Sequence, residues 1–220
     1  MPSIYRAPTV VAVQNLFAEL LQQPLAGAGI LDYLQRMVAR VELATKQRAS
    51  AVYSLFSNYH PSFLGASSES LNKIDFSLAD CRLLIAQERG FENWEEVMAL
   101  ADRHFDPDFE QALQFLLAGD QKALGQLLSE KPDLVRDRSP YPHDATLLHY
   151  CGSNGVEMWR QQVPDNLADL IKLLLDKGAD PQAKMQVYGG AFTTAELLDT
   201  SAHPRDAGNW AAAMAALDKT

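Results

Sequence analysis

A pair of helix-forming segments that recurs along the second half of the chain is the strongest constraint on its fold. The clearest helix is NLADLIKLLLDKG, residues 166–178, whose leucines and isoleucine recur at helical spacing. Asn166 is placed to cap this helix, and Gly178 to end it. Similar apolar faces occur at 109–117 and 124–128, each followed by a glycine or proline. Because such a unit cannot bury its apolar faces alone, neighbouring units must stack.

These segments resemble ankyrin repeats, in which a β-turn and two helices recur with a period of about 33 residues. The segment TLLHYC (146–151) corresponds to the opening of a repeat, and LLLDKGADPQA (173–183) to its end. Residues 116–135 fit the middle of a preceding repeat, and FTTAELL (192–198) opens a degenerate third one. The resemblance is to a bacterial ankyrin-like group with interrupted repeats, and it covers residues 105–220.

The resemblance implies an all-α fold, an ankyrin-like helical repeat solenoid with two good units and one degenerate unit. A stack of this kind needs at least about three units for stability. Helical stripes also occur between residues 9 and 104. We therefore expect residues 1–104 to form a helical N-terminal region that packs on the repeats as a cap, and residues 105–220 to form the repeat region.

The charge and composition disfavour several classes of partner. The chain has a formal net charge of −9, and so acidic a surface repels the phosphate backbone of nucleic acids. No stretch approaches the roughly 20 apolar residues that span a bilayer, and the N-terminal residues do not resemble a signal peptide. Cys81 and Cys151 lie far apart in the sequence, which predicts free thiols in a cytoplasmic protein. We expect no nucleic-acid or membrane partner.

Residues 76–104 could form a helix-turn-helix that reads DNA. Ser77 and Asp80 have the spacing of a capping box, and Asn93 can cap a second helix. Acidic side chains outnumber basic ones in this segment, which disfavours contact with DNA. An αα-hairpin that packs on its neighbour is the preferred interpretation.

The segment TLLHYCGSNG (146–155) combines residue types that occur in Cys–His active sites and in metal sites. On a helix, His149 and Cys151 would point to different sides, which disfavours a nucleophilic pair. The spacing of His143, His149 and Cys151 is not that of a zinc site, and no nucleotide-binding or hydrolase motif occurs. The ankyrin resemblance implies instead that Thr146 and His149 fix the local turn and that Cys151 fills the interior. We expect no metal and no other cofactor.

Two interruptions of the repeat pattern are the preferred places for function. Relative to the first unit, the second has an insertion at residues 156–166, and the third is interrupted at 201–209. Long loops are often functional, and aromatic and arginine side chains are typical of binding hot spots. The candidate binding residues are Trp159, Arg160, Gln161 and His203 in the insertions, and Arg138, Tyr141, His143, Met185 and Tyr188 at the hairpin tips. The structural alternative is that the two insertions pack on each other.

A non-enzymatic protein-interaction module, or scaffold, is the function that the sequence favours. Its hairpin tips and insertion loops would contact another protein, and the acidic repeat half indicates a partner surface of basic character. The alternative is a small-ligand or catalytic site in a cleft between the 156–166 and 201–209 insertions, using Arg160, Tyr188 and His203. The arginine would hold an anion, and the histidine would titrate near neutral pH. Convergence of these side chains on one pocket would favour the alternative.

Overall fold

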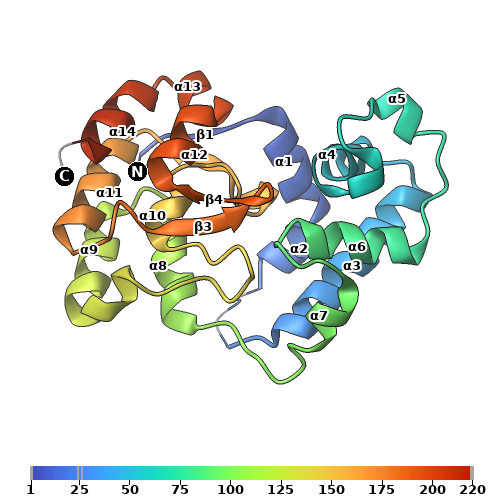
Figure 1. Ribbon diagram of the computed structural model, residues 1–220, viewed down its shortest axis with the longest axis horizontal. Coiled ribbons are helices and arrows are strands. Elements are labelled where there is room, and N and C mark those ends of the chain that lie inside the picture. The colour runs from blue at the N-terminus through green and yellow to red at the C-terminus, as the bar shows by residue number, and fades with distance from the viewer. Residues whose placement is uncertain (1, 24, 26, 219–220) are drawn as a thin grey trace. The chain divides into compact units, whose positions relative to one another are not determined.

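The computed structural model describes residues 2–23, 25 and 27–218 and is mostly helical, with few and short strands (Figure 1). The all-α class predicted from the sequence agrees with this content. The chain divides into two compact units. The continuous unit comprises Pro8–Phe105, and the split unit combines the N-terminal segment through Ala7 with the chain from Asp106 onward.

The continuous unit consists of helices joined by short turns. Their bounds are α1 Pro8–Leu16, α2 Ala18–Leu21, α3 Ile30–Lys46, α4 Ser50–Tyr59, α5 Ser68–Leu71, α6 Leu78–Gln87 and α7 Trp94–Met98, with a 3-10 turn at Pro61–Phe63. The long helix α3 buries one face, on which Leu34, Met37 and Val41 are fully covered. Helix α3 packs on α6, and α1 packs on α4, so the apolar faces of these helices meet within the unit.

Local capping residues set the starts of α6 and α7. The predicted capping box is confirmed: the backbone N–H of Asp80 donates to Ser77 Oγ at 3.1 Å, and the N–H of Ser77 donates to Asp80 Oδ2 at 2.7 Å. Asn93 Oδ1 accepts from the N–H of Glu96 at 3.0 Å and caps α7. Each bond satisfies a backbone donor that a helix terminus leaves without an intrahelical partner.

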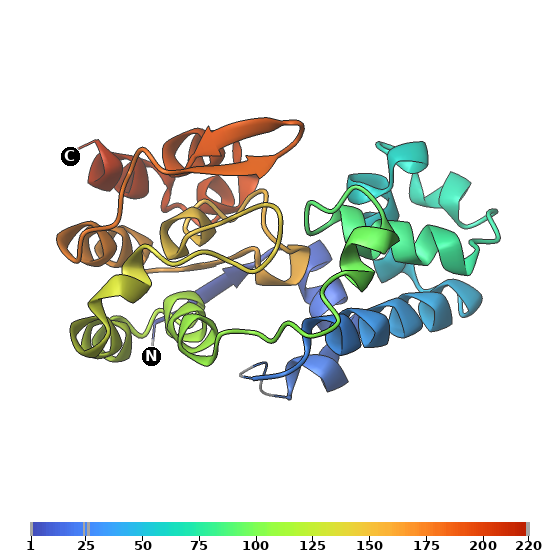
Figure 2. The same ribbon diagram turned by 60° about the horizontal axis from the view of Figure 1, so that its bottom comes forward.

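Three helix pairs occur among the described residues of the split unit. They are α8 Pro107–Leu117 with α9 Gln121–Glu130, α10 Leu147–Tyr150 with α11 Leu167–Asp176, and α12 Thr194–Thr200 with α14 Trp210–Leu217; the short α13 is Ala202–Asp206. Helices α8, α10 and α12 contact one another in that order, and α9, α11 and α14 form a second row beside them (Figure 2). The apolar side chains between and within the rows form the core of the unit.

Helix α11 follows the predicted pattern with one correction. Leu170 and Leu174 are fully buried on its apolar face, and Gly178 ends it at a φ of +94°. Asn166 does occupy the N-cap position, but its side chain makes no capping bond. Its Nδ2 donates instead to the carbonyl of Gly119 at 2.9 Å, which joins the start of α11 to the turn after α8. A tertiary partner has replaced the local one.

Four short strands complete the described part of the split unit. They are β1 Ile4–Arg6, β2 Gln162–Pro164, β3 Lys184–Val187 and β4 Gly190–Thr193; 3-10 turns lie at Pro132–Val135 and Met158–Arg160. Strands β1 and β2 are antiparallel, with Tyr5 opposite Val163. Beyond this pair, the N–H of Asp165 donates to the carbonyl of Ser3 at 2.9 Å, and the N–H of Ser3 donates to Asp165 Oδ2 at 2.9 Å. The N-terminal segment is thus paired with the end of the 156–166 insertion.

Candidate functional site

The opening motif of the second helix pair is structural, as the resemblance implied. His149 is fully buried, and its Nδ1 accepts from the N–H of Thr146 at 3.0 Å and contacts Thr146 Oγ1 at 2.8 Å. Its Nε2 lies 3.0 Å from the carbonyl of Ala183, to which it donates when Nδ1 is the acceptor. Burial raises the pKa of the Cys151 thiol to about 12, so the reactive thiolate is absent at neutral pH.

We expect the burial of His149 to make the protein less stable at mildly acidic pH. Burial outweighs the bond to Ala183 and lowers the pKa of His149 to about 4, from about 6.5 in an unfolded chain. The neutral imidazole therefore contributes stability that is complete above about pH 6.5 and is lost as the pH falls toward about 4. Between about pH 7.5 and about pH 5, urea unfolding should show the wild type losing about 2 kcal/mol more than a His149→Gln variant. Equal losses would contradict this role.

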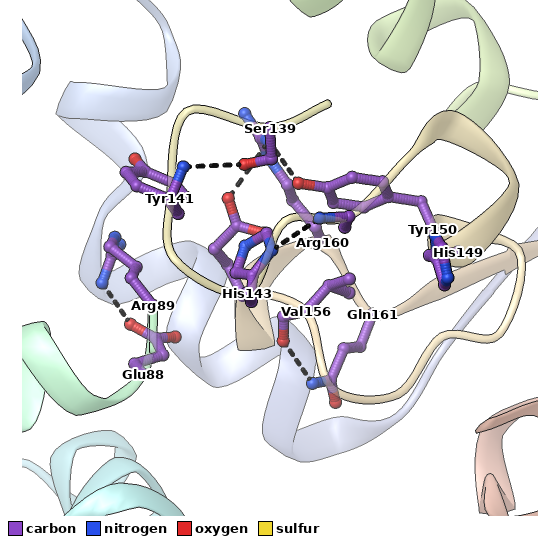
Figure 3. Close-up of polar contacts among 12 residues, drawn as sticks. Glu88, Arg89, Ser139, Tyr141, His143, His149, Tyr150, Val156, Arg160 and Gln161 are labelled. Carbon is purple, nitrogen blue, oxygen red and sulfur yellow. Dashed lines mark hydrogen bonds and ion pairs between the residues drawn. The ribbon is translucent and has the colours of Figure 1, made fainter. Parts of the chain in front are cut away.

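The 156–166 insertion contributes two members of a buried ionic cluster. Arg160 Nη2 lies 2.6 Å from Glu110 Oε2 of α8, and Arg160 Nη1 lies 3.1 Å from Glu157 Oε1. At most 3% of each of these three side chains is exposed. Figure 3 shows the guanidinium of Arg160 pointing back toward the loop that carries Ser139. The insertion is therefore attached to α8 by a charge that solvent does not reach.

Aromatic and polar side chains surround this cluster. The Arg160 guanidinium lies 4.5 Å from the ring centroid of Trp159 and 5.7 Å from that of Tyr150, distances at which a cation is attracted to a ring face. Arg160 Nη1 also donates to the Tyr150 hydroxyl at 3.5 Å. His143 Nε2 lies 3.8 Å from Glu157 Oε2, and both side chains are 1% exposed. The cluster thus connects α8, α10, the loop before α10 that carries His143, and the 156–166 insertion.

The charges of the cluster depend on one another. Burial raises the pKa of Glu110, and the nearby Arg160 opposes that rise. Burial also disfavours the charged form of Arg160, yet Glu110 and Glu157 outweigh it and hold its pKa well above the ordinary value. Two buried carboxylates, those of Glu110 and Glu157, thus share one cationic partner, the Arg160 guanidinium. This is an arrangement for fixing the insertion, because a ligand could reach Arg160 only by displacing one of its own carboxylates.

The two insertions lie side by side, as the sequence predicted. Gln161 Oε1 is 3.3 Å from His203 Nε2, and Ser201 Oγ donates to the carbonyl of Ser153 at 3.2 Å. Gln161 Nε2 donates to the carbonyl of Val156 at 2.7 Å. Burial lowers the pKa of His203, which nearby Asp206 opposes. The Gln161 amide and the His203 imidazole are therefore hydrogen-bond partners.

The three side chains proposed for a catalytic or ligand site do not converge. Arg160 faces Glu110 and Glu157, and His203 faces Gln161. The Tyr188 hydroxyl donates to Asn154 Oδ1 at 2.7 Å, at the surface. Each of the three thus has a different partner, so the alternative of one cleft that uses all three loses its geometric basis.

The hairpin residues named from the sequence separate into two groups. Tyr141, His143 and Met185 are at most 4% exposed and so do not offer side chains to a partner. Arg138 is at the surface, but its Nη1 lies 2.8 Å from Asp144 Oδ2 and donates to the carbonyl of Lys184 at 3.0 Å, which joins successive loops. Tyr188 is 62% exposed, so it alone of this set presents most of its side chain.

A surface groove of about 600 Å³ lies beside Tyr188. It is formed by the loop after α10, the β3–β4 hairpin and α12; Figure 1 shows the last two next to each other. Its lining residues are Asn154, Tyr188, Phe192, Glu196, Leu197, Asp199 and Thr200. Tyr188 and Gly189 form the two-residue turn between the strands, with φ of +54° and +73°. A positive φ is costly for tyrosine, so its presence at this turn is a feature to be explained.

Bonds around Asn154 fix the tyrosine at the rim of this groove. Asn154 accepts from the Tyr188 hydroxyl, and its Nδ2 donates to Thr200 Oγ1 at 3.1 Å. The sequence had singled out Tyr188, but it gave no signal for Asn154 or for the lining residues of α12. The same is true of Glu110 and Glu157 in the buried cluster, because carboxylates are common on helix faces and no motif distinguishes these two.

Two negative observations concern the described residues only. No helix there has both the length and the apolar character required to cross a bilayer. Within the same residues, no three His, Cys, Asp or Glu side chains are grouped so as to hold a metal ion. Comparisons of the chain with protein-family models, with curated proteins and with solved structures found no match.

Proposed function

We propose that the split unit is a short ankyrin-like solenoid that binds another protein and performs no chemistry of its own. Support for the solenoid comes from the two rows of helices, the Thr146–His149 contact at the start of the second pair, and the β3–β4 hairpin before the third. Stacked repeats of this kind present their hairpins and first helices along one surface. The groove beside Tyr188 is lined by such a hairpin and such a helix.

The exposed but fixed side chain of Tyr188 is the observation that carries this proposal. Binding hot spots are enriched in tyrosine because its large ring buries much area at a low cost in conformational entropy. The bond to Asn154 holds the Tyr188 side chain in place before a partner arrives, which reduces the cost of ordering it on binding. The half-buried Phe192 supplies further apolar surface in the same groove.

We expect Tyr188→Ala to weaken partner binding roughly 30-fold or more, the effect of losing a hot-spot residue worth about 2 kcal/mol. A photo-crosslinking amino acid at position 188 of the full chain would identify the partner in the host, and titration calorimetry would then compare the affinities.

Leu64→Ala is a matched control, because Leu64 is 63% exposed and lies in the continuous unit. Both variants should unfold at nearly the wild-type denaturant concentration, since exposed substitutions rarely change stability by more than about 0.5 kcal/mol. An affinity unchanged by Tyr188→Ala would refute the proposal.

A further inference from the structure

We propose that the groove beside Tyr188 binds an extended segment of the partner in which a basic side chain stands next to an apolar one. This inference rests on the proposed function and adds the chemistry of the partner. It follows from the two kinds of side chain that line the groove together, which are aromatic rings and carboxylates.

The apolar part of the groove fits one hydrophobic side chain and the stem of another. The Tyr188 ring is largely exposed and the Phe192 ring is half-buried, whereas only 1% of Leu197 is exposed. Long basic side chains lay their methylene groups on such surfaces while the charged end stays hydrated. A guanidinium or ammonium group can also rest on the face of a tyrosine or phenylalanine ring.

The acidic part of the groove comes from one face of α12. Glu196 and Asp199 are three residues apart on this helix and are therefore neighbours on its surface. Glu196 Oε2 accepts from the N–H and the hydroxyl of Thr193 at 2.7 and 2.9 Å, and these bonds lower the pKa of Glu196. Its carboxylate is thus charged and held in position at neutral pH.

The two carboxylates of this face differ in their cationic neighbours: the charge of Lys184 acts on Glu196 without forming an ion pair, whereas Arg205 binds Asp199. Arg205 Nη2 holds Asp199 Oδ1 at 2.9 Å, whereas no ion pair to Glu196 occurs among the described residues. Two adjacent carboxylates repel each other, and a basic side chain from a partner would relieve that repulsion. An acidic partner segment would meet these same carboxylates and be rejected.

Selection of random 12-residue peptides from a phage library on the immobilised full-length chain tests this specificity. We expect the selected peptides to be enriched in arginine or lysine beside leucine, isoleucine or phenylalanine. Replacing that basic residue by glutamine in a synthetic peptide should weaken binding at least about tenfold, which is about 1.4 kcal/mol. The Glu196→Gln, Asp199→Asn double variant should bind the two peptides almost equally. Glutamine at position 196 preserves the capping box, so the start of α12 is retained.

Glu130→Gln is the control for a general loss of negative charge, because Glu130 is an exposed carboxylate on α9; it should keep the full preference for the basic peptide. Peptides that depend on Tyr188 but show no preference for basic residues would overturn this inference and leave the proposed function standing. A basic preference that survives the double variant would also overturn it. If no selected peptide loses binding on Tyr188→Ala, the proposed function fails and this inference fails with it.

Discussion

The Arg160→Met variant should lose about 3–5 kcal/mol of the free energy of unfolding, the range measured when one partner of a buried ion pair is removed. Methionine fills a similar volume, so the loss comes from the two carboxylates that remain. Glu110 and Glu157 would be left at most 3% exposed with their shared guanidinium gone. Urea denaturation followed by circular dichroism at neutral pH would measure the change.

Two comparisons separate this charge effect from loss of packing. Adding Glu110→Gln and Glu157→Gln to Arg160→Met removes the uncompensated charges and should restore a large part of the lost stability. Arg205→Met is the matched surface control: Arg205 is also stacked on a tryptophan, Trp210, at 4.0 Å, but its side chain is 45% exposed. We expect that variant to lose less than about 1 kcal/mol. Equal losses for Arg160→Met and Arg205→Met would mean that the buried cluster does not hold the insertion.

The Gly119→Ala variant should be destabilised by about 2–5 kcal/mol, the sum of backbone strain and overpacking. Gly119 has a φ of +71°, which a residue with a Cβ rarely adopts. The added Cβ would lie 2.5 Å from Pro2 Cγ, 2.8 Å from Asn166 Oδ1 and 3.0 Å from Pro164 Cβ. The methyl group would therefore press on the N-terminal segment, the end of β2 and the start of α11 together. Hydrogen exchange at β1 and β2 should rise along with the loss of stability.

Gly208→Ala is the control for the backbone contribution to this change. Gly208 has a φ of +74°, but a Cβ there would have nothing within 4 Å. This variant should lose only about 1 kcal/mol, the lower end of the left-handed penalty. If the two alanine variants are equally stable, the close approach at Gly119 has no energetic importance.

The sequence predicted those features of the fold that depend on local pattern. The leucine spacing of α11 and the opening of α10 carry their signals within a few residues, since helical periodicity and capping are local properties. The burial of Cys151 followed from its place in that pattern. Asn166 marks the limit, because its position was predictable from its neighbours whereas its bond to Gly119 depends on a turn far back in the chain.

The candidate site was predictable only in part, for the same reason. Tyr188 was identified as an exposed aromatic residue, but its groove forms only when the loop after α10, the hairpin and α12 come together. The 156–166 insertion was singled out from the repeat pattern, yet nothing in its sequence showed that Arg160 would turn inward toward Glu110. An arginine between a tryptophan and a glutamine fits a surface loop equally well. Arg160 turns inward because it pairs with the carboxylate of Glu110, which lies 50 residues earlier in the chain.

The pairing of β1 with β2 has a consequence for the order in which the chain folds. Ser3 and Asp165, which are hydrogen-bonded to each other beyond the two strands, are 162 residues apart. Closing so long a loop costs entropy before the few hydrogen bonds of the pair can form. During synthesis, β1 must wait until the insertion has been made, while the continuous unit between them can complete its own local helices. Strand β1 can therefore pair only after almost three quarters of the chain has been made, although it is itself among the first residues synthesised.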